Sequence, residues 1–336
     1  MKLTSKAAIA TLAALTLAAC GNNNQTANAP AANSDTAQTS TAANALETKF
    51  ATIGTGGASG PYNIIGTSLS EIYAQQFGVN SKTQTTGASV ENLNLLNQKK
   101  LEMAFVMNDA LSDAVNGVGS FQQKVDNVQT MATLYPNYVQ IATSSKKGIS
   151  TIDDLRGKRV AVGAQGSGVE SSARALLESL GITYNDFTPD FLGYAEAADG
   201  LKTGKLDAAF FTSGLPNSSL MELQQGFDLQ LVAIPADKVA QAAAKNNIFV
   251  EQTIPAGTYG NDADVSTAAV MNTLVVRSDL SENDVYNLTK SFFDNLSTLQ
   301  TAHQAANGIT IENAQQGLIV DLHPGAKKYY DEVAGK

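Results

Sequence analysis

Short apolar runs alternate with segments of helical periodicity from Lys49 to the end of the chain. Residues 61–77 predict a helix, because Pro61 suits a first turn and apolar side chains such as Ile65 and Leu69 recur on one face. Further helices are expected at 90–98, from 109, at 169–180 and after 281. The expected strands are residues 50–53, 79–85, 103–106, 128–135, 159–162, 206–211 and 229–234. This alternation predicts an α/β fold with parallel sheets flanked by helices.

The strand–helix pattern restarts after residues 138–144, and a late apolar run at 268–276 precedes the last long helix. A strand–helix pattern that restarts in mid-chain, followed by a late strand and helix that rejoin the first part, indicates two α/β lobes, with the second inserted into the first. We expect residues 47–138 with 271–336 to form lobe I and residues 139–270 to form lobe II.

Residues 1–20 are typical of a targeting segment rather than of a folded domain. Lys2 and Lys6 precede an apolar run at 7–17 that is too short to span a bilayer. The run ends at Cys20 in a Leu-Ala-Ala-Cys sequence that resembles the lipobox of bacterial lipoproteins, in which the cysteine is lipidated. We expect a signal peptide, a lipid anchor on Cys20 and a place in the periplasm or cell envelope. The alternative is an ordinary signal peptide with an incidental cysteine.

The remaining composition narrows the classes of protein. Residues 21–46 are almost free of large apolar groups and predict a disordered tether. Cys20 is the only cysteine, so the mature domain has no disulfide. The net charge is −9, with 31 acidic and 22 basic residues, which argues against nucleic acid as a partner. We expect a monomer.

Three stretches of small polar residues each lie between an expected strand and an expected helix, at 54–60, 85–89 and 163–168. In an open parallel sheet the carboxyl ends of the strands border the ligand crevice. Helix N-termini there present unpaired N–H groups and partial positive charge, which suit an anion. Three such loops, divided between two lobes, predict a carboxylate ligand in the cleft between them.

The catalytic alternatives lack parts that they require. A dinucleotide loop would need glycine where the chain has Ser59, and the acidic residue that should follow is missing. Ser144-x-x-Lys147 with a Lys-Thr-Gly at 202–204 echoes penicillin-binding enzymes, but no Ser-x-Asn lies between them. His303 and His323 have no metal-binding spacing. We therefore expect no enzymatic activity, no cofactor and no metal.

Taken in order along the chain, these loops resemble the TAXI family of TRAP-transporter solute receptors. The matching stretches are 53–57, 59–62, 86–92, 108–109, 154–163, 166–168, 254–259 and 322–326. The resemblance implies a two-lobed, type II periplasmic-binding-protein fold with the ligand between the lobes. It also implies a sodium-coupled membrane permease as partner, without ATP, and ligands such as glutamate, glutamine or dicarboxylates.

The cleft positions of the TAXI family correspond in this chain to Thr55, Ser59, Tyr62, Ser89, Asn92, Asn108, Ser167, Gly168, Ser213 and Tyr259. One departure is Met107, where many members carry a glutamine. The expected function is therefore an extracytoplasmic receptor that captures a small carboxylate, a glutamate-like amino acid or a dicarboxylate, for a TRAP-type secondary transporter. The alternatives are a ligand-sensing co-receptor for a membrane sensor and an exported enzyme.

Overall fold

The computed structural model describes residues 45–335. Cys20, the signal segment and residues 21–44 of the expected tether lie outside the described residues. The strands are β1 (Phe50–Gly54), β2 (Asn80–Gln84), β3 (Met103–Met107), β4 (Val128–Ser144), β5 (Arg159–Ala161), β6 (Thr188–Asp190), β7 (Ala208–Ser213), β8 (Leu229–Val232), β9 (Phe249–Ile254) and β10 (Val265–Arg277). The helices are α1 (Pro61–Phe77), α2 (Ser89–Asn97), α3 (Asn108–Asn116), α4 (Gly168–Ser179), α5 (Tyr194–Lys202), α6 (Ser218–Leu223), α7 (Ala236–Lys245), α8 (Glu282–Asp294), α9 (Leu296–Ala302) and α10 (Pro324–Val333).

The strands form a mixed sheet in the order β2-β1-β3-β10-β4-β7-β5-β6. β1, β2 and β3 are parallel, and so are β5, β6 and β7. β10 is antiparallel to β3 and β4, and β4 is antiparallel to β7. The α/β fold is as the sequence predicts. The expected parallel pairing holds for β1–β3 and for β5–β7, whereas the two long strands β4 and β10 run antiparallel to their neighbours.

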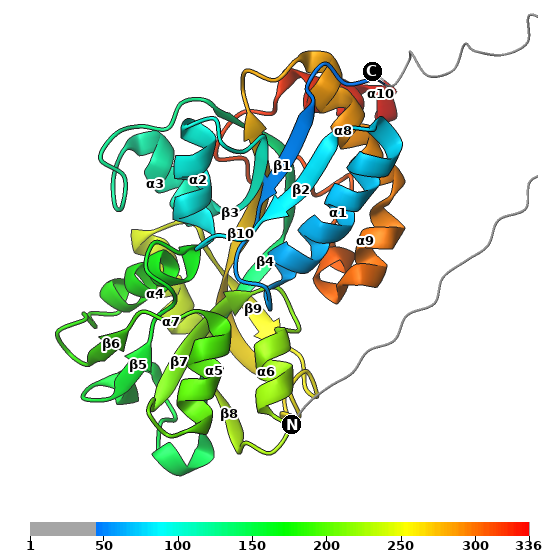
Figure 1. Cartoon of the computed structure of the whole chain (residues 1–336). Helices are drawn as coiled ribbons and strands as arrows, with labels where there is room; N and C mark the ends of the chain where they lie inside the picture. The colour runs from blue at the N-terminus through cyan, green and yellow to red at the C-terminus, as the bar shows by residue number, and fades with distance from the viewer. Residues whose placement is uncertain (1–44, 336) are drawn as a thin grey trace, which may run out of the picture. The chain divides into compact units, whose positions relative to one another are not determined.

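β4 and β10 pass from one lobe to the other, as Figure 1 shows. The first part of β4 pairs with β10, and from Tyr138 onward it pairs with β7. β10 pairs with β9 up to Val270 and with β3 from Asn272. The lobe boundaries expected from the sequence, 138/139 and 270/271, fall at these changes of partner. We propose the same division, with both strands acting as hinges.

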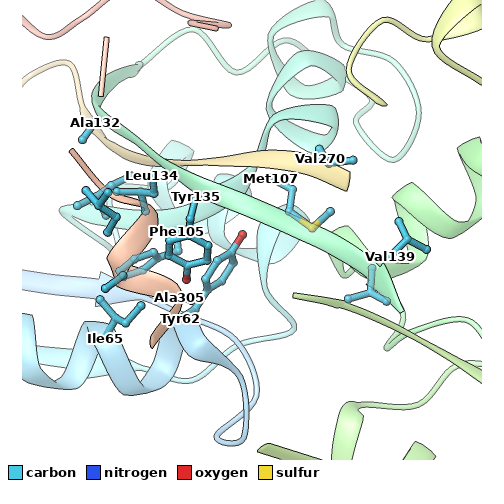
Figure 2. Packing of buried hydrophobic residues seen from close by; sticks show 14 of the residues in the cluster. Tyr62, Ile65, Phe105, Met107, Ala132, Leu134, Tyr135, Val139, Val270 and Ala305 are labelled. Carbon is cyan, nitrogen blue, oxygen red and sulfur yellow. The ribbon is translucent and has the colours of Figure 1, made fainter. Parts of the chain in front are cut away.

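The parallel strands of lobe I are covered by helices on both faces, which explains their apolar sequences. In β3, the side chains of Phe105 and Met107 join the main core cluster with α1, whereas Ala104 and Val106 pack with α2 and α3. Figure 2 shows Tyr62, Phe105, Tyr135 and Ala305 gathered in one group, with Ile65 at its edge. The Tyr62 and Phe105 rings stack with centroids 5.1 Å apart, so α1 is held firmly on the sheet.

The C-terminal segment differs from the single long helix expected after Ser281. The helix breaks at Asn295, which separates α8 from α9. His303 therefore lies beyond α9, where its Nδ1 accepts a hydrogen bond from the Ala305 amide. His323 caps α10 through a bond from the Gly325 amide. Both histidines thus have local structural roles. No helix within residues 45–335 has the length and apolar character that crossing a membrane requires.

Candidate functional site

A cavity of about 270 Å³ lies among the loops that precede α1, α2, α4 and α5. On the proposed division, the first two helices belong to lobe I and the last two to lobe II, so the cavity lies between the lobes. Its lining residues are Gly56, Gly57, Gly60, Pro61, Tyr62, Thr86, Gly87, Ala88, Ser89, Met107, Asn137, Gly163, Ala164, Ser167, Gly168, Val169, Leu192, Gly193, Tyr194, Glu196, Thr212 and Ser213.

Four helices begin at the cavity wall, and their N-cap residues Gly60, Ala88, Ser167 and Gly193 all line it. Each helix start offers unpaired N–H groups and about half a positive charge. The lining residues, all within the described part of the chain, include no Lys or Arg, and Glu196 is the only charged side chain. Among these lining residues, the helix starts are therefore the only source of partial positive charge.

Ala88 at the start of α2 has a φ of 75°, a conformation that costs a non-glycine residue about 1–3 kcal/mol. Its Cβ lies against Gly56, where an added Cβ would be 3.2 Å away. Strained backbone of this kind is common at ligand sites. Here the strain directs the first turn of α2 toward the cavity.

The two lobes touch at the mouth of the cavity. A Cβ added to Gly168 would lie 2.5 Å from Ser89 Oγ and 2.8 Å from Met107 Sδ. One added to Gly60 would lie 3.4 Å from the Tyr194 ring. Only glycine permits this close approach at Gly168, so the loops of lobe I and lobe II are in contact beside the cavity.

Two serine hydroxyls on opposite lobes donate to no partner within residues 45–335, so their protons can serve a ligand. Ser89 Oγ accepts from the Met107 amide at 3.0 Å, and Ser167 Oγ accepts from the Glu170 amide at 3.1 Å. An oxygen that already accepts can still donate its own proton. Ser213 differs, because it accepts from Gln140 and donates to the Gly214 carbonyl at 3.0 Å.

Two tyrosines complete the wall. Tyr194 donates to the Thr212 carbonyl at 2.6 Å, whereas Tyr62 accepts from Asn137 Nδ2 at 2.8 Å. Burial raises the pKa of Tyr62 well above its usual value, and the nearby Tyr135 raises it further. The Tyr62 hydroxyl therefore keeps its proton at neutral pH.

Asp109 lies in the first turn of α3, two residues after the cavity-lining Met107, and is 5% exposed. Its Oδ1 accepts from the Ala110 amide at 2.8 Å, and within residues 45–335 its Oδ2 has no partner. Burial raises the pKa of Asp109 to about 7. This carboxyl therefore titrates in the physiological range.

Five of the site residues expected from the sequence line the cavity: Tyr62, Ser89, Ser167, Gly168 and Ser213. The others lie elsewhere. Asn92 is buried and donates to the Thr55 and Phe105 carbonyls at 2.7 and 2.9 Å, which joins β1 to β3. Thr55 itself bonds to the Gln84 carbonyl at 3.1 Å.

Asn108, Tyr259 and Ser59 also lie off the wall. Asn108 donates to the Gly317 carbonyl at 3.2 Å and accepts from Thr273 at 2.7 Å. Tyr259 accepts from the Asn217 amide at 2.6 Å. Ser59 lies in the loop before α1 and is partly exposed. Direct ligand contact by these residues remains a prediction.

Four further residues line the cavity that were not predicted from the sequence: Asn137, Tyr194, Glu196 and Thr212. Two of them, Tyr194 and Glu196, lie in the first turn of α5, after the fourth loop at the cavity, and the only sequence signal of that loop was Gly193 before a helical stretch. Asn137 gave no signal, because it follows a proline in a segment that reads as a break between strands.

Ser144, Lys147 and the Lys-Thr-Gly at 202–204 line one separate hollow. Lys147 Nζ, however, binds Asp207 at 2.7 Å, and Ser144 Oγ accepts from the Lys146 amide at 3.3 Å. The serine is thus a cap for a short turn and is not activated by the lysine.

Three solved structures illustrate which known proteins have a similar fold. A protein of Bordetella bronchiseptica RB50 is 16% identical, with 85% of this chain and 82% of that chain covered and a TM-score of 0.53. A periplasmic transporter is 14% identical, with 87% and 94% covered and a TM-score of 0.53. The binding component of an ABC phosphonate transporter from Pseudomonas aeruginosa is 12% identical, with 76% and 78% covered and a TM-score of 0.52.

These likenesses establish the two-lobed fold of periplasmic binding proteins. The family is established separately, since the model of the NMT1-like family matches residues 53–334, from β1 to the end of α10. On that match, this chain belongs to the NMT1-like family.

Proposed function

We propose that this protein is an extracytoplasmic solute-binding receptor that captures a small carboxylate and delivers it to a TRAP-type secondary transporter of the TAXI kind. The observation that carries the proposal is the convergence of four helix N-termini on one cavity between the lobes. Backbone N–H groups and the Ser89 and Ser167 hydroxyls suit a carboxylate. The two sets of loops come from different lobes, so binding and closure are coupled.

The charge in the cavity favours a glutamate-like amino acid over a dicarboxylate. Glu196 is exposed at the cavity and would attract the ammonium group that an amino acid carries and a simple dicarboxylate lacks. A phosphonate, the solute class named for the transporter of the Pseudomonas relative, would be repelled by Glu196 when it carries no ammonium group.

Binding is tested by thermal unfolding and calorimetry with L-glutamate, L-glutamine, 2-oxoglutarate and methylphosphonate. We expect L-glutamate to stabilise the protein, by about 2.7 kcal/mol at a hundredfold excess over its Kd, without turnover. Glu196→Gln should weaken L-glutamate more than 2-oxoglutarate. Stabilisation by methylphosphonate alone would refute the carboxylate assignment, and steady product formation would favour an enzyme.

The transporter partner is tested in membrane vesicles that contain a candidate TRAP-type permease, to which the purified receptor and its ligand are added. A TRAP-type partner gives uptake driven by a sodium gradient without ATP, and uptake that requires ATP would refute it. We also propose that Cys20 carries a lipid anchor. In the cell, Cys20→Ser should release the protein from the membrane fraction, and unchanged fractionation would contradict the anchor.

A further inference from the structure

Two buried asparagines lie where β4 and β10 cross between the lobes. Asn137 is 1% exposed and Asn272 is 0% exposed. Asn272 Nδ2 donates to the Tyr135 carbonyl and, at 3.3 Å, to Asn137 Oδ1. Asn137 Nδ2 in turn donates to Tyr62 Oη at 2.8 Å. A chain of hydrogen bonds therefore runs from the backbone of β4 to the cavity wall.

The Tyr135 carbonyl fixes the donor and the acceptor of every hydrogen bond in this series. A carbonyl oxygen can only accept, so Asn272 must turn its amide nitrogen toward Tyr135. The second N–H of that nitrogen then requires an acceptor, which turns Asn137 Oδ1 toward Asn272. Asn137 is left with its nitrogen facing Tyr62, and the Tyr62 oxygen must accept.

The orientation of these amides determines where the Tyr62 hydroxyl proton points. Since Tyr62 Oη accepts from Asn137, its own proton must point elsewhere, and no acceptor for it occurs within residues 45–335. Tyr62 lines the cavity, and its ring is held by stacking on Phe105. Figure 2 shows the Tyr62 hydroxyl extending from α1 toward the side where Met107 lies.

We propose that Asn272 and Asn137 are positioning residues that set the polarity of Tyr62, so that its hydroxyl always donates to the bound solute. This inference rests on the proposed function. It means that the hinge strands help to select a ligand with an acceptor at this point, such as a carboxylate oxygen, and to reject one that presents an N–H group.

Stability alone does not account for these residues. Asn272 Oδ1 is buried without a partner in the described part of the chain, which is unfavourable for folding. A leucine of similar size would avoid that cost. Asn272 also does not line the cavity, so an effect of this residue on binding must be transmitted through Asn137.

A double-mutant cycle with L-glutamate tests the chain of bonds by calorimetry. Tyr62→Phe should weaken binding by about ten- to a hundredfold, the worth of one hydrogen bond to a charged acceptor, and Asn272→Leu should weaken it as well, because Asn137 is then free to reverse and accept the Tyr62 proton. In the Tyr62→Phe background, Asn272→Leu should change the Kd less than about threefold. An equal loss in both backgrounds would mean that Asn272 acts independently of Tyr62 and would overturn the proposal.

A second measurement needs no ligand, so it separates failure of this inference from failure of the proposed function. In protein labelled with ¹³Cζ-tyrosine, Asn272→Leu should shift the Tyr62 resonance, because Asn137 is freed to reverse and accept the Tyr62 proton. The shift should vanish in the Asn137→Leu background. Asn272→Ala breaks the same bonds without adding bulk and serves if the leucine variant does not fold.

The matched control is Asn287→Leu, which replaces another buried asparagine in α8 that bonds only to Asn283 within residues 45–335. It should leave the Tyr62 resonance and the L-glutamate Kd unchanged. A Tyr62 resonance that is unchanged by Asn272→Leu but shifted by Asn287→Leu would overturn the proposed role of Asn272.

Discussion

Gly168→Ala is the most direct test of how closely the lobes must approach. Gly168 begins α4, and its φ lies outside the left-handed region, so alanine is acceptable to the backbone there. The added Cβ would lie 2.5 Å from Ser89 Oγ and 2.8 Å from Met107 Sδ, where ordinary contacts are 3.4–4 Å. The two loops must therefore separate by roughly 1 Å, an overpacking that costs about 1–3 kcal/mol.

The overpacking destabilises the closed arrangement of the two lobes, whereas the stability of α4 itself is unaffected. The expected result is a Kd for L-glutamate raised about 5- to 150-fold, with an unchanged or slightly raised melting temperature of the free protein. Gly57→Ala is the matched control, because Gly57 also lines the cavity and a Cβ there would meet no atom within 4 Å. Equal affinities of the two variants in calorimetry would refute the idea that binding requires this contact.

Three further outcomes are expected. Ser167→Ala should weaken L-glutamate binding about ten- to a hundredfold in calorimetry at a cost of about 1 kcal/mol in stability, whereas Ser144→Ala should leave binding unchanged; the reverse pattern would place the ligand elsewhere. The folded-state pKa of Asp109, about 7, exceeds its unfolded value of about 3.9, so its stabilising effect is complete below pH 4 and is lost as the pH rises to 7. In urea titrations, the free energy of unfolding of the wild type should therefore fall by roughly 3 kcal/mol more between pH 5 and pH 8 than that of Asp109→Asn. Equal pH profiles of the two proteins would contradict this. Gly325→Ala should destabilise the protein by several kcal/mol in the same titrations, because its Cβ would collide with the Glu282 carbonyl of α8; a wild-type midpoint would show that α10 can move.

The sequence predicted those elements whose local pattern agrees with their final surroundings. β3 is buried on both faces and reads as an unbroken apolar run, Met103–Met107. The loops before α1, α2 and α4 are rich in glycine and serine, which suits helix starts at a ligand site. The gathering of these helix starts around one cavity was therefore open to prediction from residue types alone.

The rest depended on pairing between distant segments. Pro136 and Asn137 read as a break between two strands, yet β4 continues through them because β10 pairs along that stretch. A register shift in β10 between Met271 and Thr273 lies opposite Pro136. The fourth loop was missed because β6 is a short edge strand, Thr188–Asp190, with no apolar run. Local sequence carries neither fact.

The position of β10 in the sheet also dictates the order in which the chain can complete its lobes. β10 lies between β3 and β4, although more than a hundred residues of sequence separate it from either strand. Until residues 265–277 have emerged, β3 and the first half of β4 have open edges, which invite pairing with other chains. Lobe I, which begins first, is thus finished last. A chain truncated before β10 should aggregate rather than persist as a half-receptor.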